Sequence, residues 1–218
     1  MRLPRIDPVV ESGDVLMGPR VLLVCTANIC RSPAAARLLA GRLGPSIDVI
    51  SRGTRSLPGA GICPASATWA LMNGGQATGP HHSRPLELAD IKSSTLILTA
   101  SQRQRTKVIE LRPSAQVRTF TLVQAARIAH WRAGAPGLEP APADADLPHR
   151  LLWLTEELDA HRGAAGRPIP ESADDLPDPH HGGSHPDVFV SLLSAVETLC
   201  APLRPQYGAA AAVNRLRR

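Results

Sequence analysis

Several residue types are scarce in this sequence, and each scarcity argues against a class of protein. Only 3% of the 218 residues are aromatic, and no basic run carries interleaved aromatic side chains. We therefore expect no nucleic-acid partner, although the formal net charge is +5. Only two lysines, Lys92 and Lys107, are among the 24 basic residues, so the positive charge reflects a chain-wide preference for arginine. Four cysteines are too few for a disulfide scaffold of this size and fit a reducing compartment.

Long apolar runs are also missing. No window approaches the roughly 18 uninterrupted apolar residues that a membrane-spanning helix requires. Residues 1–14 contain charges and prolines where a signal peptide needs an apolar stretch. With 43% hydrophobic and 20% charged residues, the composition is that of a soluble globular protein. We expect a cytoplasmic protein with no membrane partner; the sequence leaves the oligomeric state open.

The distribution of proline and glycine predicts the domain organisation. Residues 1–18 carry both without a sustained hydrophobic period and are predicted to form a mobile N-terminal extension. Residues 19–200 are predicted to form one domain, with an exposed insertion near residues 133–148 that is rich in proline, alanine and glycine. Residues 201–218 are predicted to form a basic C-terminal tail.

Within the predicted domain, short apolar runs alternate with helical patterns. The strands are expected at residues 20–25, 47–51, 95–99 and 116–121. The helices are expected at residues 34–40, 64–72, 101–111, 122–131, 147–161 and 186–200. This alternation predicts an α/β fold, in which a parallel sheet carries helices on both faces.

The first predicted strand is joined to the first predicted helix by a segment with distinctive chemistry, Val-Cys-Thr-Ala-Asn-Ile-Cys-Arg-Ser-Pro at residues 24–33. Backbone N–H groups in such a loop can converge on an anion at the positive end of the following helix. Arg31 can offer a planar fork to two phosphoryl oxygens, and Cys25 would lie below the phosphorus as a nucleophile. The same donors, with the Ser32 hydroxyl, favour the thiolate form of Cys25.

This segment resembles the phosphate-binding loop of the low-molecular-weight protein tyrosine phosphatases. Residues 51–54 (Ser-Arg-Gly-Thr), 81–86 (His-His-Ser-Arg-Pro-Leu), 96–99 (Leu-Ile-Leu-Thr) and 175–179 (Asp-Leu-Pro-Asp-Pro) resemble further segments of that family. The likeness runs from about Pro19 to Cys200. It implies a three-layer sandwich around a four-stranded parallel sheet of flavodoxin-like topology. It also implies hydrolysis of a phosphotyrosyl protein through a phosphocysteine intermediate, with no metal and no cofactor.

The resemblance also implies the roles of individual residues. Cys25 would be the nucleophile, Arg31 would clamp the phosphate, and Asp178 would protonate the leaving oxygen and then activate water. Asn28 would hold the strained backbone of the loop, supported by His81. The predicted phosphate-binding residues are Thr26, Ala27, Asn28, Ile29, Cys30, Arg31 and Ser32.

The other cysteines have different expected roles. Cys30, in the same loop, is hypothesised to form a reversible disulfide that protects or switches off Cys25, because a reactive thiolate is the species that oxidises. Packing under the loop is the alternative for Cys30. Cys63 and Cys200 match no site and are interpreted as packing residues.

The sequence departs from the family at three places. Ala27 stands where glycine is common, and would be strained if that position needs a positive φ. His180-His181 follow the Asp-Pro motif, where the family often has aromatic rings that hold the substrate. Ser101 replaces an aspartate found after the third strand of many members.

Three alternatives to a tyrosine phosphatase follow. A protein arginine phosphatase can use the same scaffold, although resembling members carry threonine where this chain has Ile29. An arsenate reductase would need redox cysteines that residues 74–99 lack. A catalytically weak phosphoprotein-binding module would capture phosphate without turning it over, and Ala27 is its best support.

Overall fold

The computed structural model describes residues 18–77, 79–142 and 144–204. The predicted mobile extension at residues 1–18, apart from Gly18, lies outside the described residues. So does most of the predicted tail at residues 201–218; its first residues, Ala201–Leu203, form a 3-10 helix, η4.

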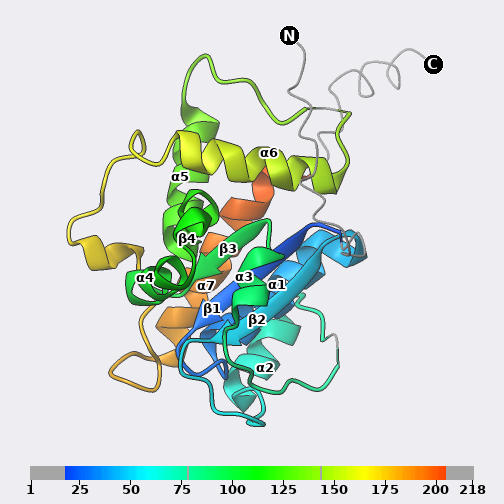
Figure 1. Ribbon diagram of the computed structural model, residues 1–218, viewed down its shortest axis with the longest axis vertical. Coiled ribbons are helices and arrows are strands. Elements are labelled where there is room, and N and C mark those ends of the chain that lie inside the picture. Colours follow the sequence, from blue (N-terminus) through cyan, green and yellow to red (C-terminus); the bar gives the residue numbers. More distant parts are fainter. Residues whose placement is uncertain (1–17, 78, 143, 205–218) are drawn as a thin grey trace.

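Four parallel strands form the sheet, in the spatial order β2-β1-β3-β4 (Figure 1). They are β1 (Arg20–Cys25), β2 (Asp48–Gly53), β3 (Leu96–Thr99) and β4 (Thr119–Thr121). The chain moves outward from β1 to β2 and then crosses back to β3, so the strand order reverses between β1 and β3. In open α/β sheets, ligands bind at such a switch point, beyond the carboxyl ends of the strands.

Alternate residues of β1 enter two separate cores. Val21, Leu23 and Cys25 belong to the larger core, whereas Leu22 and Val24 belong to the smaller core on the opposite face. Side chains of successive strand residues point to opposite faces, so a strand that is apolar at every position must be covered on both sides. The predicted fold class, a three-layer α/β sandwich, is confirmed.

The helices divide between these two faces. The larger core takes side chains from α1 (Arg31–Leu43), α2 (Pro64–Met72), α5 (Leu122–Gly134), α6 (Leu147–Ala160) and α7 (His185–Cys200). The smaller core takes Ile91 from α3 (Leu88–Lys92) and Val108 from α4 (Gln102–Leu111). All helices that were expected are present, with ends that differ by a few residues.

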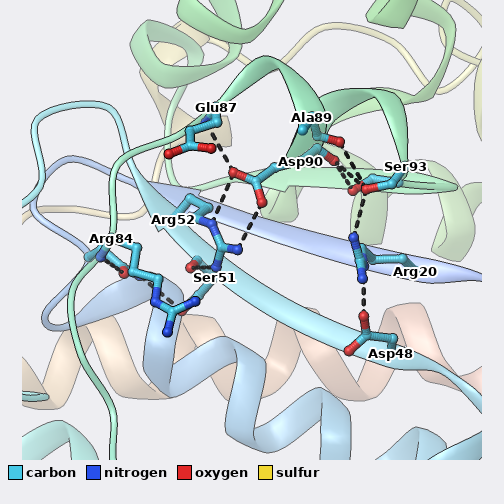
Figure 2. Close-up of polar contacts among 11 residues, drawn as sticks. Arg20, Asp48, Ser51, Arg52, Arg84, Glu87, Ala89, Asp90 and Ser93 are labelled. Atoms are coloured by element: carbon cyan, nitrogen blue, oxygen red, sulfur yellow. Dashed lines mark hydrogen bonds and ion pairs between the residues drawn. The ribbon is translucent and has the colours of Figure 1, made fainter. Parts of the chain in front are cut away.

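The short helix α3 was not expected. Its start is set by a capping box. The Glu87 side chain accepts from the backbone N–H of Asp90, and the Asp90 side chain accepts from the backbone N–H of Glu87. Asp90 also pairs with the guanidinium group of Arg52 on β2 at 2.8 Å. Figure 2 shows this pair beside the Arg20–Asp48 pair at 2.6 Å. The two ion pairs lie along the edge of the sheet, and the first one fastens α3 to β2.

The predicted strand at residues 116–121 is shorter than expected, because a 3-10 helix (η2, Pro113–Arg118) occupies its first half. In the predicted insertion, the described residues between α5 and α6 form no helix or strand.

Among the described residues, the stretch His185–Leu203 has the length and apolar composition of a membrane-spanning helix, with a mean hydropathy of 1.3. Its side chains Val188, Leu192, Val196 and Leu199 are buried in the protein. The core helix of a globular protein satisfies the same criteria of length and composition, so this feature alone is weak support for a membrane span.

Candidate active site

The segment from Thr26 to Cys30 leaves the carboxyl end of β1 and enters α1 at Arg31. Cys30 is the N-cap residue of α1 but supplies no side-chain cap to the helix. The backbone amides of Ala27, Ile29 and Cys30 donate to no acceptor within the described part of the chain. Free amides at the N-terminus of a helix provide the positive potential that an anion needs.

Cys25 lies at the base of this loop with its sulfur atom buried. The side chain is held between the Ser32 hydroxyl, at 3.0 Å from Sγ, and the backbone N–H of Asn28, which donates to Sγ at 3.3 Å. Both groups can donate to a thiolate, and hydrogen bonds to the charged form stabilise it. Both donors are therefore placed to contact this sulfur atom from within the loop.

Asn28 holds the loop in shape through its completely buried side chain. Its Nδ2 donates to the hydroxyl of Ser51 at 2.9 Å and to that of Ser32 at 3.1 Å, while its Oδ1 accepts from the backbone N–H of Arg84 at 3.0 Å. Its φ angle of 57° lies in the left-handed region, which asparagine tolerates better than most residues. The positive φ thus falls on Asn28, not on Ala27, so the conditional strain at Ala27 does not arise.

Gly53, the last residue of β2, allows the loop to pass close to the neighbouring strand. A Cβ atom at this position would lie 2.7 Å from the carbonyl oxygen of Thr26 and 3.1 Å from Cβ of Asn28. Such a contact with backbone is too short for any other residue. The glycine of the Ser-Arg-Gly-Thr segment is therefore required by the packing of β2 against the loop.

His81 and Ser83 fasten the outer side of the loop. Nε2 of His81 lies 2.7 Å from the carbonyl oxygen of Asn28, and the Ser83 hydroxyl donates to the carbonyl of Ala27 at 2.7 Å. Because a carbonyl only accepts, Nε2 of His81 carries the proton. Burial lowers the pKa of His81 below its ordinary value and outweighs the opposing effect of this hydrogen bond. The structure thus brings His81 to Asn28, as expected.

Arg31 and Asp178 meet although 147 positions separate them in the sequence. Nη2 of the almost fully buried Arg31 forms an ion pair with Oδ2 of Asp178, and its Nη1 donates to the carbonyl of Leu176 at 3.1 Å. The Asp-Pro segment therefore lies against the phosphate-binding loop in this structure.

The two nearby aspartates are engaged elsewhere. Asp174 is paired with Arg127 at 2.7 Å. Asp175 accepts from the backbone N–H of Gln102 at 2.8 Å, and its burial raises the pKa of the carboxyl above the ordinary value. Of these three carboxylates, Asp178 is the one whose side chain pairs with Arg31.

Sequence reasoning missed one support of the loop. The side-chain amide of Gln104, on α4, donates to the hydroxyl of Thr26 at 3.0 Å and also accepts a hydrogen bond from Ser101. Ser101 stands where many family members have aspartate, so here that position acts on the loop through Gln104. Nothing in the local sequence around α4 indicates this contact, which depends on the packing of α4 beside β1 and β3.

A second group of side chains also converges near the loop. Cys30, Cys63, His180 and His185 place their potential ligand atoms within 4.8 Å of one another. Cys63 was expected to be a packing residue and His180 to stand at a lost aromatic position, and no role was expected for His185. Residues far apart in the chain gave no spacing signal that could have revealed this cluster.

Comparison with known proteins places this geometry in a family. The family model described as low molecular weight phosphotyrosine protein phosphatase matches residues 20–136. A protein-arginine-phosphatase of Geobacillus stearothermophilus is 33% identical over 105 residues, covering 48% of this chain and 70% of that protein. The low molecular weight protein-tyrosine-phosphatase Wzb of Salmonella typhi is 31% identical over 112 residues, covering 51% and 70%.

Solved structures show the same fold. The tyrosine phosphatase AmsI of Erwinia amylovora has a TM-score of 0.55 at 20% identity, covering 93% of this chain and 95% of its own. The YwlE arginine phosphatase of Geobacillus stearothermophilus has a TM-score of 0.53 at 24% identity, covering 91% and 95%. The family match ends before Asp178, so the assignment of that residue depends on the geometry described above. The chain belongs to the low molecular weight phosphotyrosine protein phosphatase family.

Proposed function

We propose that this protein hydrolyses phosphomonoesters of phosphotyrosyl proteins through a phosphocysteine intermediate on Cys25. The observation that carries the proposal is the buried sulfur between Ser32 and an amide of the loop, next to free amides and the Arg31 guanidinium. These groups are donors, and all of them belong to the loop between β1 and α1 or to the first turn of α1. A dianionic phosphate is the ligand that they match best.

The first chemical step breaks the bond between phosphorus and the leaving oxygen. The phosphate displaces Asp178 from Arg31 and binds the guanidinium group and the loop amides. The Cys25 thiolate attacks phosphorus in line with the leaving oxygen, forming the S–P bond as the P–O bond breaks. Asp178, in its protonated form, gives its proton to the leaving oxygen, which departs as an alcohol or a phenol.

The second step releases phosphate. A water molecule attacks the phosphorus of the phosphocysteine while the Asp178 carboxylate accepts the proton of that water. The S–P bond breaks, inorganic phosphate leaves, and the thiolate is restored with the hydrogen bond from Ser32. Throughout both steps the loop amides and Arg31 stabilise the charge on the equatorial oxygens, and electrostatic stabilisation of this kind is usually the largest contribution to such catalysis.

Phosphotyrosine is the substrate side chain that we propose. Leu57, which is 53% exposed, has its backbone N–H bonded to the hydroxyl of Ser83 at 3.1 Å, and Ser83 in turn holds the loop. Leu57 therefore presents apolar surface beside the phosphate-binding loop, and an aromatic leaving group would lie at this place. The similarity to relatives named as tyrosine phosphatases supports phosphotyrosine as the substrate side chain. The relative named as an arginine phosphatase makes phosphoarginine the second candidate.

The boundaries of the catalytic unit are part of this proposal. Residues 19–200 form one domain, because side chains of α6 and α7 share the larger core with β1, as Leu154 and Leu192 illustrate. The described residues of the segment near 133–148 then form an insertion between α5 and α6. We place the protein in the cytoplasm, where thiols stay reduced.

The test is hydrolysis of p-nitrophenyl phosphate by the purified protein and its Cys25→Ser and Asp178→Asn variants. The first variant should lose turnover completely, and the second should be slowed by about 100-fold or more, as expected when a general acid is removed. Absence of turnover by the wild-type protein, with retained binding of a phosphopeptide, would instead identify a binding module.

Phosphotyrosine, phosphoserine and phosphoarginine peptides then define the substrate. We expect phosphotyrosine to be hydrolysed fastest and phosphoserine slowest, because a short side chain does not bring its phosphate to the base of the loop. A preference for phosphoarginine would replace the tyrosine assignment and leave the mechanism at Cys25 intact.

A further inference from the structure

Four side chains beside the phosphate-binding loop have the composition of a tetrahedral metal centre. They are two cysteines, Cys30 and Cys63, and two histidines, His180 and His185, and their ligand atoms all lie within 4.8 Å of one another. Cys30 immediately precedes α1, Cys63 immediately precedes α2, and His185 is the first residue of α7. His180 belongs to the loop that follows the Asp-Pro motif. Three helix starts and one loop thus converge on a single point.

The side chains of this cluster already face one another. Sγ of Cys63 lies 3.4 Å from Nε2 of His185. The imidazole rings of His180 and His185 lie edge to face, with centroids 4.9 Å apart. Two ligands of a tetrahedral ion cannot have their rings stacked in parallel, so the edge-to-face arrangement fits a shared ion.

The distances between the ligand atoms also fit a tetrahedral zinc site. With Zn–S bonds of about 2.3 Å and Zn–N bonds of about 2.0 Å, the ligand atoms of a tetrahedral site lie about 3.3–3.8 Å apart. All separations in the structure are within 4.8 Å, so the site forms with a movement of at most about 1.5 Å, which is within the reach of the exposed His180. Each cysteine gives up its proton when the ion binds, so two protons are released.

The surroundings of the ligands hold them in place. The Ser66 hydroxyl lies 2.9 Å from Sγ of Cys30. The ring of His185 lies against that of Phe189, at 5.5 Å between centroids, and Phe189 is itself stacked on Trp69 at 4.5 Å. Neighbours that orient the ligands are a general feature of metal centres and tune their affinity.

We propose that Cys30, Cys63, His180 and His185 form a binding site for Zn²⁺. Thiolate and imidazole ligands in a set of four select zinc over hard cations such as Mg²⁺ and Ca²⁺, which take oxygen ligands. The charge also balances, because two thiolates neutralise a divalent ion at helix starts that would otherwise repel it. None of the four ligand atoms takes part in the proposed hydrolytic steps, so the metal site stands whether or not the chain is a phosphatase.

The ion joins two parts of the proposed active site. Cys30 belongs to the phosphate-binding loop, and His180 lies two residues after Asp178. A bound ion therefore fastens the loop that carries Asp178 to the phosphate-binding loop and to the start of α2. This fastening adds to the ion pair of Asp178 with Arg31 and the hydrogen bond from Arg31 to the Leu176 carbonyl.

Cobalt absorption tests the site without reference to activity. The full chain is stripped of metal, kept reduced with a phosphine, and titrated with Co²⁺. We expect a thiolate-to-cobalt charge-transfer band and the intense visible bands of tetrahedral cobalt, saturating at one equivalent and disappearing when Zn²⁺ is added. A weak octahedral spectrum, or no binding by the reduced protein, would overturn the proposal.

Variants identify the ligands. Cys63→Ser and His185→Gln should each lower the Zn²⁺ affinity, measured by competition with a chromophoric chelator, by at least about 100-fold, because removal of a ligand costs more than loss of an outer neighbour. Cys25→Ser, Cys200→Ser and His181→Ala should leave that affinity unchanged. Loss of binding in Cys25→Ser with retention in Cys63→Ser would place the ion at the nucleophile instead and refute the site.

Hydrogen exchange tests the fastening of the loop. Saturating Zn²⁺ should slow amide exchange of the segment around His180 in the wild-type protein, and should leave it unchanged in Cys63→Ser. Equal exchange rates with and without Zn²⁺ in the wild-type protein would contradict the structural role assigned to the ion.

Discussion

Replacement of Asn28 removes the side chain that makes three hydrogen bonds from within the phosphate-binding loop. Asn28→Ala removes three hydrogen bonds, two from Nδ2 and one to Oδ1, at a position with no solvent exposure. It also places alanine at a φ of 57°. With about 1 kcal/mol for each hydrogen bond and roughly 1 kcal/mol for the left-handed backbone, the free energy of unfolding should fall by about 4 kcal/mol.

The matched variant Asn28→Gly separates these two contributions. Glycine loses the same hydrogen bonds but adopts a positive φ without strain, so it should be about 1 kcal/mol more stable than alanine at this position. Urea denaturation followed by circular dichroism measures both values. A fall of less than about 1 kcal/mol in Asn28→Ala, or an alanine variant more stable than the glycine variant, would refute the reasoning.

Two further predictions concern the strand beside the loop and the closing helix. Gly53→Ala places a Cβ 2.7 Å from the carbonyl oxygen of Thr26, so the loop must shift. Phosphatase activity should therefore fall at least about tenfold. An unchanged kcat/KM would show that the close approach of β2 to the loop is not required. Hydrogen bonds from Arg42, and secondarily from Arg204, hold the pKa of Glu197 below its usual value of 4.5. The Glu197 carboxylate therefore stabilises the fold above pH 4.5, and this stabilisation is lost as the pH falls through the lowered pKa. Glu197→Gln should therefore lower the free energy of unfolding by up to about 1 kcal/mol at pH 7, discounted for solvent screening, and the difference from wild type should vanish in acid; a deficit that is independent of pH would contradict this explanation.

Local sequence predicted much of the fold, because the signals for its elements are local. The apolar run of β1 and the proline at the start of α1 indicate a buried strand and a following helix without reference to the rest of the chain. The role of Asn28 in the loop came from the resemblance to the family, and it is physically reasonable because asparagine is one of the few residues that tolerate positive φ. The short helix α3 was missed because five residues give too little periodicity to distinguish it from a loop.

Contacts between distant segments could not be predicted from local sequence. The resemblance to the family suggested Asp178, but its pairing with Arg31 depends on the return of the chain across 147 positions. The support of Thr26 by Gln104 and the convergence of Cys63 with His185 had no local signal at all. The first depends on the packing of α4 beside the loop, and the second on how the starts of α2 and α7 meet. Three-dimensional packing therefore brings Asp178 and the supporting residues to the loop, while local sequence indicates Cys25 and Arg31.

Trapping of the phosphocysteine intermediate shows whether Cys25 is the nucleophile. The protein is mixed with an excess of p-nitrophenyl phosphate, quenched in acid within the first turnover, digested and analysed by mass spectrometry. We expect one phosphoryl group on the peptide that contains Cys25, attached through sulfur, and none in Cys25→Ser. Turnover by the wild-type protein without this adduct, together with residual activity of Cys25→Ser, would contradict this role of Cys25.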